Sequence, residues 1–149
     1  MIPRLREKYK NEIIKKYFKK IARVNSVEIK VLDEPKPLGT GGALNILKKR
    51  SINDFFLING DSYFEISNKE FLKMQATNKI GSLLLIKNEN YKSNKKLANL
   101  KVNKGKISKK GNLMNSGIYF FKKKILKQIP LKPFSLENDF LEGKIIYNK

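Results

Sequence analysis

Short continuous runs of apolar residues constrain the fold of this chain more than any other feature of its sequence. They lie at residues 54–58, 82–86 and 117–121 and are bounded by polar or turn-forming residues. Continuous apolar runs of this length are typical of strands that are covered on both faces of a sheet. Segments with helical periodicity lie between them. This alternation of strands and helices predicts an α/β domain with a mostly parallel sheet.

Periodicity, caps and turn residues predict the remaining elements. We expect an amphipathic helix whose apolar face is formed by Tyr9, Ile13, Ile14, Tyr17, Phe18 and Ile21. The expected helices cover Leu5–Ala22, Ala43–Lys49, Ser67 to about Thr77 behind a capping box, a short segment ending at Ile129, and Leu136–Leu141 capped by Ser135. Alternating patterns predict further strands over Val27–Val31, around Ala98–Val102, from Ile107 after a turn, and over Ile145–Tyr147.

Composition limits the chemistry that is open to this protein. Its 149 residues, of which 40% are hydrophobic, suit one globular domain with a modest core. There is no Cys and no His, so thiolate and imidazole chemistry is excluded, and carboxylates, lysines, backbone amides or a bound metal ion are left. No apolar run approaches the ~20 residues of a membrane span. We therefore expect a soluble cytoplasmic protein that does not bind to a membrane.

The charge is strongly positive, with 33 Lys and Arg against 13 Asp and Glu and a net charge of +20. The arginines are confined to Arg4, Arg6, Arg23 and Arg50, whereas surfaces that read nucleic-acid sequence usually recruit Arg. Lysines spread along the whole chain beside many Asn fit a bias toward A-rich codons better. We expect no specific nucleic-acid partner, although sequence-blind attraction to polyanions follows from the charge. A Lys-rich nucleic-acid-binding protein stays open as an alternative.

Two segments are candidates for chemistry. Asp61 follows the apolar run 54–58, and ligands of open α/β sheets bind beyond the carboxyl ends of strands, where a carboxylate can hold Mg²⁺. The alternative is that Asp61 caps a turn. The loop Leu38–Ala43 is rich in glycine and opens a helix, so it offers backbone N–H groups to a ligand. It fits neither a dinucleotide fingerprint nor a P-loop, and it could be a plain strand-to-helix turn.

Four motifs that follow one another in a fixed order indicate a family more specifically than any one of them does alone. They are Glu34–Ala43 with its Pro-Leu-Gly-Thr-Gly-Gly core, Phe56–Asp61, Asn115–Tyr119 and Phe134–Glu137. In this arrangement the chain resembles the sugar-1-phosphate nucleotidyltransferase family, and within it the heptose-1-phosphate and mannose-1-phosphate guanylyltransferases. The resemblance covers nearly all of residues 1–149 and implies the Rossmann-like fold of nucleotide-diphospho-sugar transferases.

The resemblance also implies a role for each motif. In such enzymes the sugar phosphate attacks the α-phosphorus of a nucleoside triphosphate, here GTP by preference, and pyrophosphate leaves without a protein nucleophile. The product is a nucleotide sugar for surface polysaccharide synthesis. The implied sites are Leu38, Gly39, Thr40 and Gly42 for the nucleotide, Asp61 for Mg²⁺, Asn115 and Gly117 for the sugar phosphate, and Glu137 for a sugar hydroxyl.

The chain departs from the family at three places. It contains no Gly-Gly-x-Gly-Thr-Arg loop for the triphosphate, no counterpart of the second metal aspartate, and Lys109–Asn112 where a Glu-Lys pair is common. We therefore expect a partial domain, incomplete at both ends, that is inactive alone and uses a complementary N-terminal fragment. The strands Val27–Val31 and Phe55–Ile58 should then lack neighbours. A noncatalytic remnant is the other alternative.

Overall fold

The computed structural model describes residues 8–20, 23–24, 27–34, 36–62, 65–76, 79–87, 100–103, 106–109 and 111–141. Its helical elements are α1 (Lys8–Lys20), α2 (Gly39–Gly42), the 3₁₀ segment η1 (Ala43–Lys49), α3 (Asn68–Gln75), the 3₁₀ turn η2 (Lys123–Lys127) and the π-helical turn η3 (Leu136–Phe140). Its strands are β1 (Arg23–Val24), β2 (Val27–Glu28), β3 (Phe55–Ile58), β4 (Gly81–Lys87), β5 (Leu100–Asn103), β6 (Lys106–Lys109) and β7 (Leu113–Phe121).

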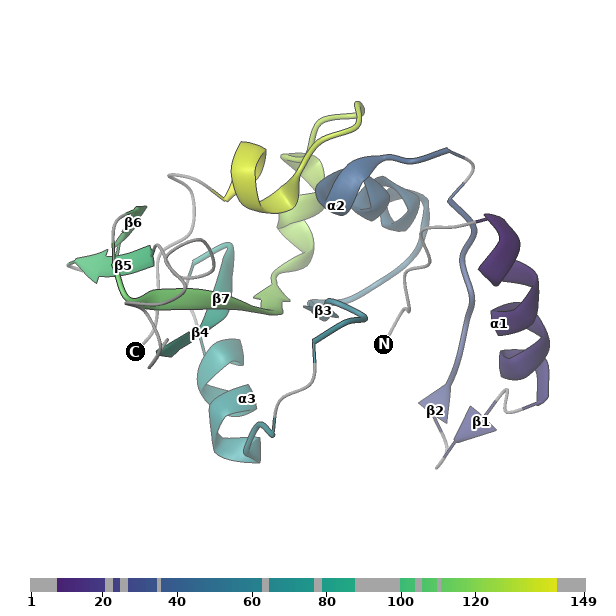
Figure 1. Ribbon diagram of the computed structural model, residues 1–149, viewed down its shortest axis with the longest axis horizontal. Coiled ribbons are helices and arrows are strands. Elements are labelled where there is room, and N and C mark those ends of the chain that lie inside the picture. Colours follow the sequence, from purple (N-terminus) through teal and green to yellow (C-terminus); the bar gives the residue numbers. More distant parts are fainter. Residues whose placement is uncertain are drawn as a thin grey trace.

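Strand β7 is the centre of the main sheet (Figure 1). It pairs with β3 on one side and β4 on the other, and it meets the β5–β6 hairpin through Leu100 and Leu113. Both β3 and β4 are antiparallel to β7, so they run in the same direction and α3 connects them. β1 and β2 form a separate two-stranded ladder.

The expected α/β class is confirmed, but the sheet is not mostly parallel. Every strand pairing in the described part of the chain is antiparallel. The reason is that β7 inserts between β3 and β4, which would otherwise form a parallel pair joined by a helix. The hydrophobic pattern predicts a helix between β3 and β4, and hence that the two strands run in the same direction. It does not predict which later strand lies between them.

Both faces of the sheet are covered, as the apolar runs predicted. Alternate residues of β7 point to opposite sides: Tyr119 and Phe121 pack into a large cluster, and Ile118 and Phe120 into a smaller one. The large cluster joins η1, η2 and η3, whereas Met74 of α3 contributes to the smaller one. Figure 1 shows α3 on one side of β7 and the other helical turns opposite. The burial of large apolar side chains on both faces of a sheet supplies most of the stability of such a layer.

Strand β3 has both faces packed, and one of its edges is paired within the residues that the structure describes. Phe55 and Leu57 contact the large cluster, and Phe56 and Ile58 contact the smaller one. Within the described residues β3 pairs with β7 alone, and all four of its residues are only partly buried. Its other edge has no ladder partner among the residues that the structure describes, and the expectation that the strand lacks a neighbour stays a prediction.

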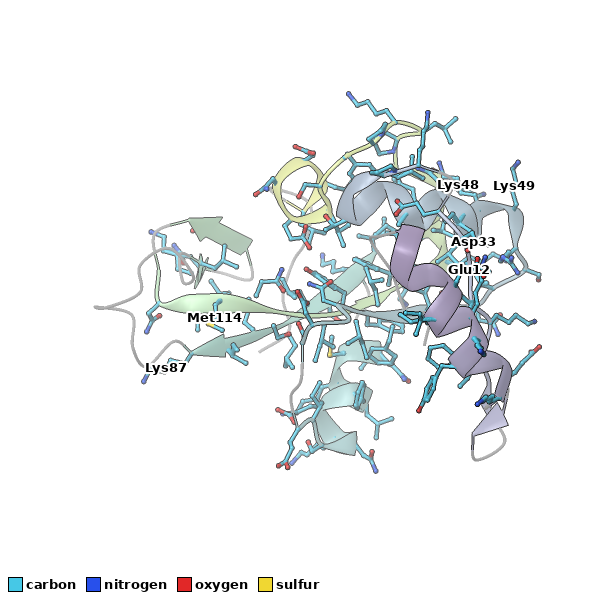
Figure 2. All side chains as sticks on the ribbon, turned by 45° about the vertical axis from the view of Figure 1, so that its right-hand side comes forward. Glu12, Asp33, Lys48, Lys49, Lys87 and Met114 are labelled. Atoms are coloured by element: carbon cyan, nitrogen blue, oxygen red, sulfur yellow. The ribbon has the colours of Figure 1, made fainter. Side chains whose placement is uncertain are left out.

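Helix α1 forms where it was expected, and its apolar face is only partly buried. Ile13 is 60% exposed and Tyr17 59% exposed, whereas Ile14 and Phe18 are half-buried. An ion pair fixes α1 to the following extended segment, with Lys15 Nζ 2.8 Å from Asp33 Oδ2 and 3.9 Å from Glu12 Oε1. Glu12 and Asp33 lie together beside α1 in Figure 2. The helical period was thus correct, and of the predicted stripe Ile14 and Phe18 are partly covered while Ile13 and Tyr17 are exposed.

The other expected elements are mostly confirmed. The capping box of α3 is present, with Glu70 N–H donating to Ser67 Oγ and Ser67 N–H to Glu70 Oε2, and Ser135 caps η3. Of the strand expected over Val27–Val31, Val27–Glu28 pairs with β1, and residues 29–31 have no ladder partner within the described part of the chain. Thr77, Ala98 and Ile145–Tyr147 lie outside the described residues. None of the described helices combines the length and apolar character that a membrane span requires.

Candidate functional site

The glycine-rich segment is the first turn of a helix that packs against the segment around Phe134. Gly39 has a φ of +77°, a conformation that L side chains rarely adopt. A Cβ on Gly39 would collide with the Phe134 carbonyl, and one on Gly41 with the Phe134 ring. These glycines are therefore required for the close approach of residues 39–42 to residues 132–136, a contact between segments far apart in sequence.

Two of the backbone N–H groups of this turn, those of Gly41 and Gly42, are engaged within the protein. Gly41 and Gly42 both donate to the carbonyl of Phe134, at 3.0 and 3.4 Å, and Phe134 N–H donates to Leu38 O at 3.0 Å. Leu38 N–H donates to Glu34 Oε1 at 2.8 Å, which explains the glutamate at the start of this motif. The carbonyl of Phe134 is thus the acceptor for the two glycine N–H groups.

Thr40 brings this turn to Glu137. Its hydroxyl donates to Glu137 Oε2 at 2.6 Å and accepts from Leu136 N–H at 2.8 Å. The two residues are 97 positions apart, and Figure 1 shows η3 beside α2. A residue expected at the nucleotide and one expected at the sugar are thus in direct contact.

Glu137 accepts hydrogen bonds from two further hydroxyl groups. Tyr119 Oη donates to Glu137 Oε1 at 3.1 Å, and Ser135 Oγ donates to Oε2 at 3.1 Å. An ionised carboxylate offers about four acceptor positions, so the protein itself occupies most of those of Glu137. Its implied role as acceptor for a sugar hydroxyl therefore has to use the capacity that remains.

Asn115 is connected to the same network through Tyr119. Asn115 Nδ2 donates to Tyr119 Oη at 2.6 Å, and Asn115 Oδ1 accepts from Gly117 N–H at 2.8 Å. The structure thus joins Thr40, Glu137, Asn115 and Gly117, all predicted from sequence as site residues, through Tyr119. We call these five residues the motif network.

Tyr119 is the member that the sequence prediction missed. It is fully buried, and desolvation, followed by the charge of Glu137, raises its pKa well above the usual range. Its phenol therefore stays neutral and can donate to the carboxylate. The signal in the sequence was its position at the end of Asn115–Tyr119, on the same side of the strand as Asn115.

A bulge in β7 presents Gly117 to the turn that carries Asp61. Asn115 pairs with Leu85 and Tyr119 with Leu83, so three residues of β7 lie opposite one residue of β4. Ser116 Oγ closes the bulge by donating to Leu84 O at 2.8 Å. Gly117 has a φ of +75°, and its carbonyl accepts from Asn59 N–H at 2.9 Å.

Asp61 lies in the turn directly after β3. Ser62 N–H donates to Asn59 O at 3.2 Å within that turn, and the Asp61 side chain is exposed. The turn therefore places a carboxylate at the end of β3, beside the Gly117 bulge. Among the described residues no three His, Cys, Asp or Glu side chains gather to form a metal cage. Mg²⁺ is commonly held by one or two carboxylates together with substrate phosphates and water, and a single exposed aspartate fits that mode.

Comparison with known proteins finds relatives of one kind, although no protein-family model matches the chain. The D-glycero-alpha-D-manno-heptose 1-phosphate guanylyltransferase of Campylobacter jejuni is 33% identical over 141 residues, covering 90% of this chain and 61% of the relative. The enzyme of the same name from Aneurinibacillus thermoaerophilus is 31% identical over 151 residues, covering 95% and 64%. A mannose-1-phosphate guanyltransferase of Hypocrea jecorina is 25% identical and covers 95% and 42%.

Solved structures agree with these relatives. HddC from Yersinia pseudotuberculosis, also solved in complex with GMP-PN, has a TM-score of 0.70 and 28% identity, covering 94% of this chain and 64% of HddC. The inositol-1-phosphate CTP transferase from T. maritima has a TM-score of 0.58 and 21% identity, which bears on the fold alone. The chain spans less than two thirds of the length of these relatives.

Proposed function

Because this chain belongs to the sugar-1-phosphate nucleotidyltransferase family, we propose that it provides the sugar-phosphate side of a guanylyl transfer. The observation that carries the proposal is the motif network. It joins Thr40, from the segment expected at the nucleotide, to Asn115 and Glu137, from segments expected at the sugar phosphate. The guanylyltransferase names of the relatives support GTP and a sugar 1-phosphate as substrates. Nucleotide-sugar biosynthesis follows as the process.

In the proposed reaction an oxygen of the sugar phosphate attacks the α-phosphorus of GTP. The new P–O bond joins the sugar phosphate to GMP, while the bond to the β-phosphate breaks and pyrophosphate leaves. The protein has to align the two phosphates and balance their charge rather than supply a nucleophile. Asn115 has a second amide N–H that can donate to the sugar phosphate. Its Oδ1 accepts from Gly117 N–H, and Gly117 O in turn accepts from Asn59 N–H in the turn that carries Asp61.

Asp61 is the residue proposed to hold Mg²⁺. Its carboxylate is exposed at the end of β3, and a bound ion would supply charge neutralisation on the displaced pyrophosphate. Asp54 and Glu65 are less suited to this role. Asp54 precedes β3 at the opposite end of the strand, where its Oδ1 accepts from Lys123 N–H at 2.8 Å. Glu65 lies beyond the turn and belongs to none of the four motifs.

The triphosphate requires a further element. The 149 residues contain no Gly-Gly-x-Gly-Thr-Arg loop, and the N–H groups of Gly41 and Gly42 already donate to Phe134. The edge of β3 that does not face β7 has no partner among the described residues, although both faces of the strand are packed. Strands packed on both faces are usually interior strands. We propose that a complementary segment pairs with this edge and contributes the triphosphate loop.

Pyrophosphate release tests the proposal. The chain is assayed with GTP, mannose 1-phosphate and Mg²⁺, first alone and then fused behind the N-terminal segment of the Campylobacter jejuni relative. We expect release from the fusion that depends on both substrates, and none from the chain alone. A folded fusion that releases no pyrophosphate with mannose 1-phosphate or with the heptose 1-phosphate would refute the proposed function. Release by the chain alone would refute the need for a second segment.

A further inference from the structure

The hydrogen bonds around Glu137 have only one possible direction. A carboxylate accepts and does not donate, so the hydroxyls of Thr40, Ser135 and Tyr119 must all donate to it. A hydroxyl has a single proton, and these three protons are therefore committed to Glu137. Tyr119 Oη keeps its lone pairs, and one of them accepts from Asn115 Nδ2 at 2.6 Å. The chain of hydrogen bonds therefore runs, from donor to acceptor, from Asn115 to Tyr119 and from Tyr119 to Glu137.

This order leaves little capacity for a ligand. Asn115 Nδ2 has one N–H bonded to Tyr119 and a second that the described contacts do not use, while its Oδ1 accepts from Gly117 N–H. The direction in which the second N–H points is set by the first, because both lie in the plane of one amide group. The orientation of that amide is therefore determined by Tyr119 Oη together with Gly117 N–H.

We propose that Tyr119 is a positioning residue that couples Thr40 and Glu137 to the amide of Asn115. The inference rests on the proposed function for the identity of the ligand, a sugar 1-phosphate, but not for the coupling itself. Hydrogen bonds in a chain polarise one another in a buried, low-dielectric site. A change at Thr40 therefore alters the charge density on Glu137, the strength of the Tyr119 bond to Glu137, and finally the bond from Asn115.

The coupling has a spectroscopic signature in the chain without ligand. The NMR resonances of the Asn115 side-chain amide are compared in the parent, Thr40→Val, Tyr119→Phe and the double variant. Tyr119→Phe removes the acceptor, so one amide proton moves upfield. Thr40→Val removes a donor from Glu137, which then attracts the Tyr119 proton more strongly, and the same amide proton moves downfield. In the Tyr119→Phe background the effect of Thr40→Val should disappear.

Two results would overturn the coupling. One is an Asn115 amide that does not respond to Thr40→Val, and the other is an equal response in the presence and absence of the Tyr119 hydroxyl. Should Tyr119→Phe not fold, Ser135→Ala replaces it, because Ser135 also donates to Glu137 Oε2 at 3.1 Å. It should shift the amide proton in the same direction as Thr40→Val, and an unchanged resonance in both variants would reject the coupling.

Binding of mannose 1-phosphate, followed by the same resonances, tests the consequence for the ligand. We expect Tyr119→Phe to raise its Kd about tenfold, equivalent to ~1.4 kcal/mol. The control is Ser82→Ala, which removes another buried hydroxyl of the same sheet, one that donates to Met74 O at 2.8 Å. It should leave the Kd unchanged, and an equal loss in both variants would show a general structural effect. If the parent does not bind, the proposed sugar site is refuted, whereas the ligand-free spectra still decide the coupling.

Discussion

Replacement of Gly117 by Ala tests how tightly the Asp61 turn is tied to β7. Gly117 has a φ of +75°, where an L residue carries a strain of roughly 1–2 kcal/mol. The added Cβ would lie 2.6 Å from Ser62 Oγ and 2.8 Å from Asn59 Nδ2, closer than real Cβ contacts allow. Overpacking of this kind costs about 1–3 kcal/mol. Together the two effects predict a loss of about 2–5 kcal/mol in the free energy of unfolding.

The assay is urea unfolding followed by far-UV circular dichroism and by tyrosine fluorescence, since the chain has 6 Tyr and no Trp. With a slope of about 2 kcal/mol per molar urea, in the middle of the usual range, the midpoint should fall by roughly 1–2.5 M. Ser62→Ala provides the matched background, because it removes the closest atom and leaves the φ strain. Gly117→Ala should therefore cost less in that background than in the parent.

A Gly117→Ala variant whose free energy of unfolding lies within about 0.5 kcal/mol of the parent, the range of an ordinary surface substitution, would refute both the strain and the overlap at this position. An equal cost in the parent and the Ser62→Ala background would refute the overlap with the Ser62 hydroxyl, and would leave backbone strain and the overlap with Asn59 as the source of the cost.

Three further predictions address the motif network, the glycine turn and α3. Burial and Glu137 raise the pKa of Tyr119 in the folded state, so its stabilising effect is complete below the ordinary tyrosine pKa of about 10 and is lost as the pH rises above it; Tyr119→Phe should flatten that decline in unfolding experiments, and an unchanged decline would contradict the shift. Gly41→Ala places a Cβ against the Phe134 ring and should cost about 1–3 kcal/mol in urea unfolding, whereas a neutral effect would exclude the close approach. Ser67→Ala removes the N-cap of α3 and should cost about 1 kcal/mol, with faster amide hydrogen exchange in α3 alone; unchanged exchange there would show that the cap is dispensable.

Local signals in the sequence predicted much of the fold because they act over a few residues. The capping box of Ser67 and Glu70 and the apolar runs of β3, β4 and β7 each appear where they were expected. The insertion of β7 between β3 and β4 could not be predicted in this way. It depends on pairing between residues more than sixty positions apart in sequence, such as Phe56 and Phe120, for which one sequence contains no local signal.

In the candidate site, too, the local features could be predicted from the sequence and the long-range contacts could not. The motifs supplied Thr40, Asn115, Gly117 and Glu137, and the structure brings all four into one hydrogen-bonded network. The use of the Gly41 and Gly42 N–H groups by Phe134 was not predictable, since the acceptor lies on a distant segment. Periodicity correctly gave the helix α1, but burial of its apolar face depends on a neighbour that periodicity cannot supply.

Turnover of the Asp61→Asn variant tests the central claim of this account most directly. In the fusion that carries a triphosphate loop, Asn keeps the shape of Asp61 and removes its charge, so folding should be nearly unchanged while pyrophosphate release collapses at the same Mg²⁺ concentration. Asp54→Asn and Glu65→Gln are the controls and should retain most of the parental rate. Near-parental turnover by Asp61→Asn would contradict the metal assignment and, with it, the proposed nucleotidyl transfer at this end of the sheet.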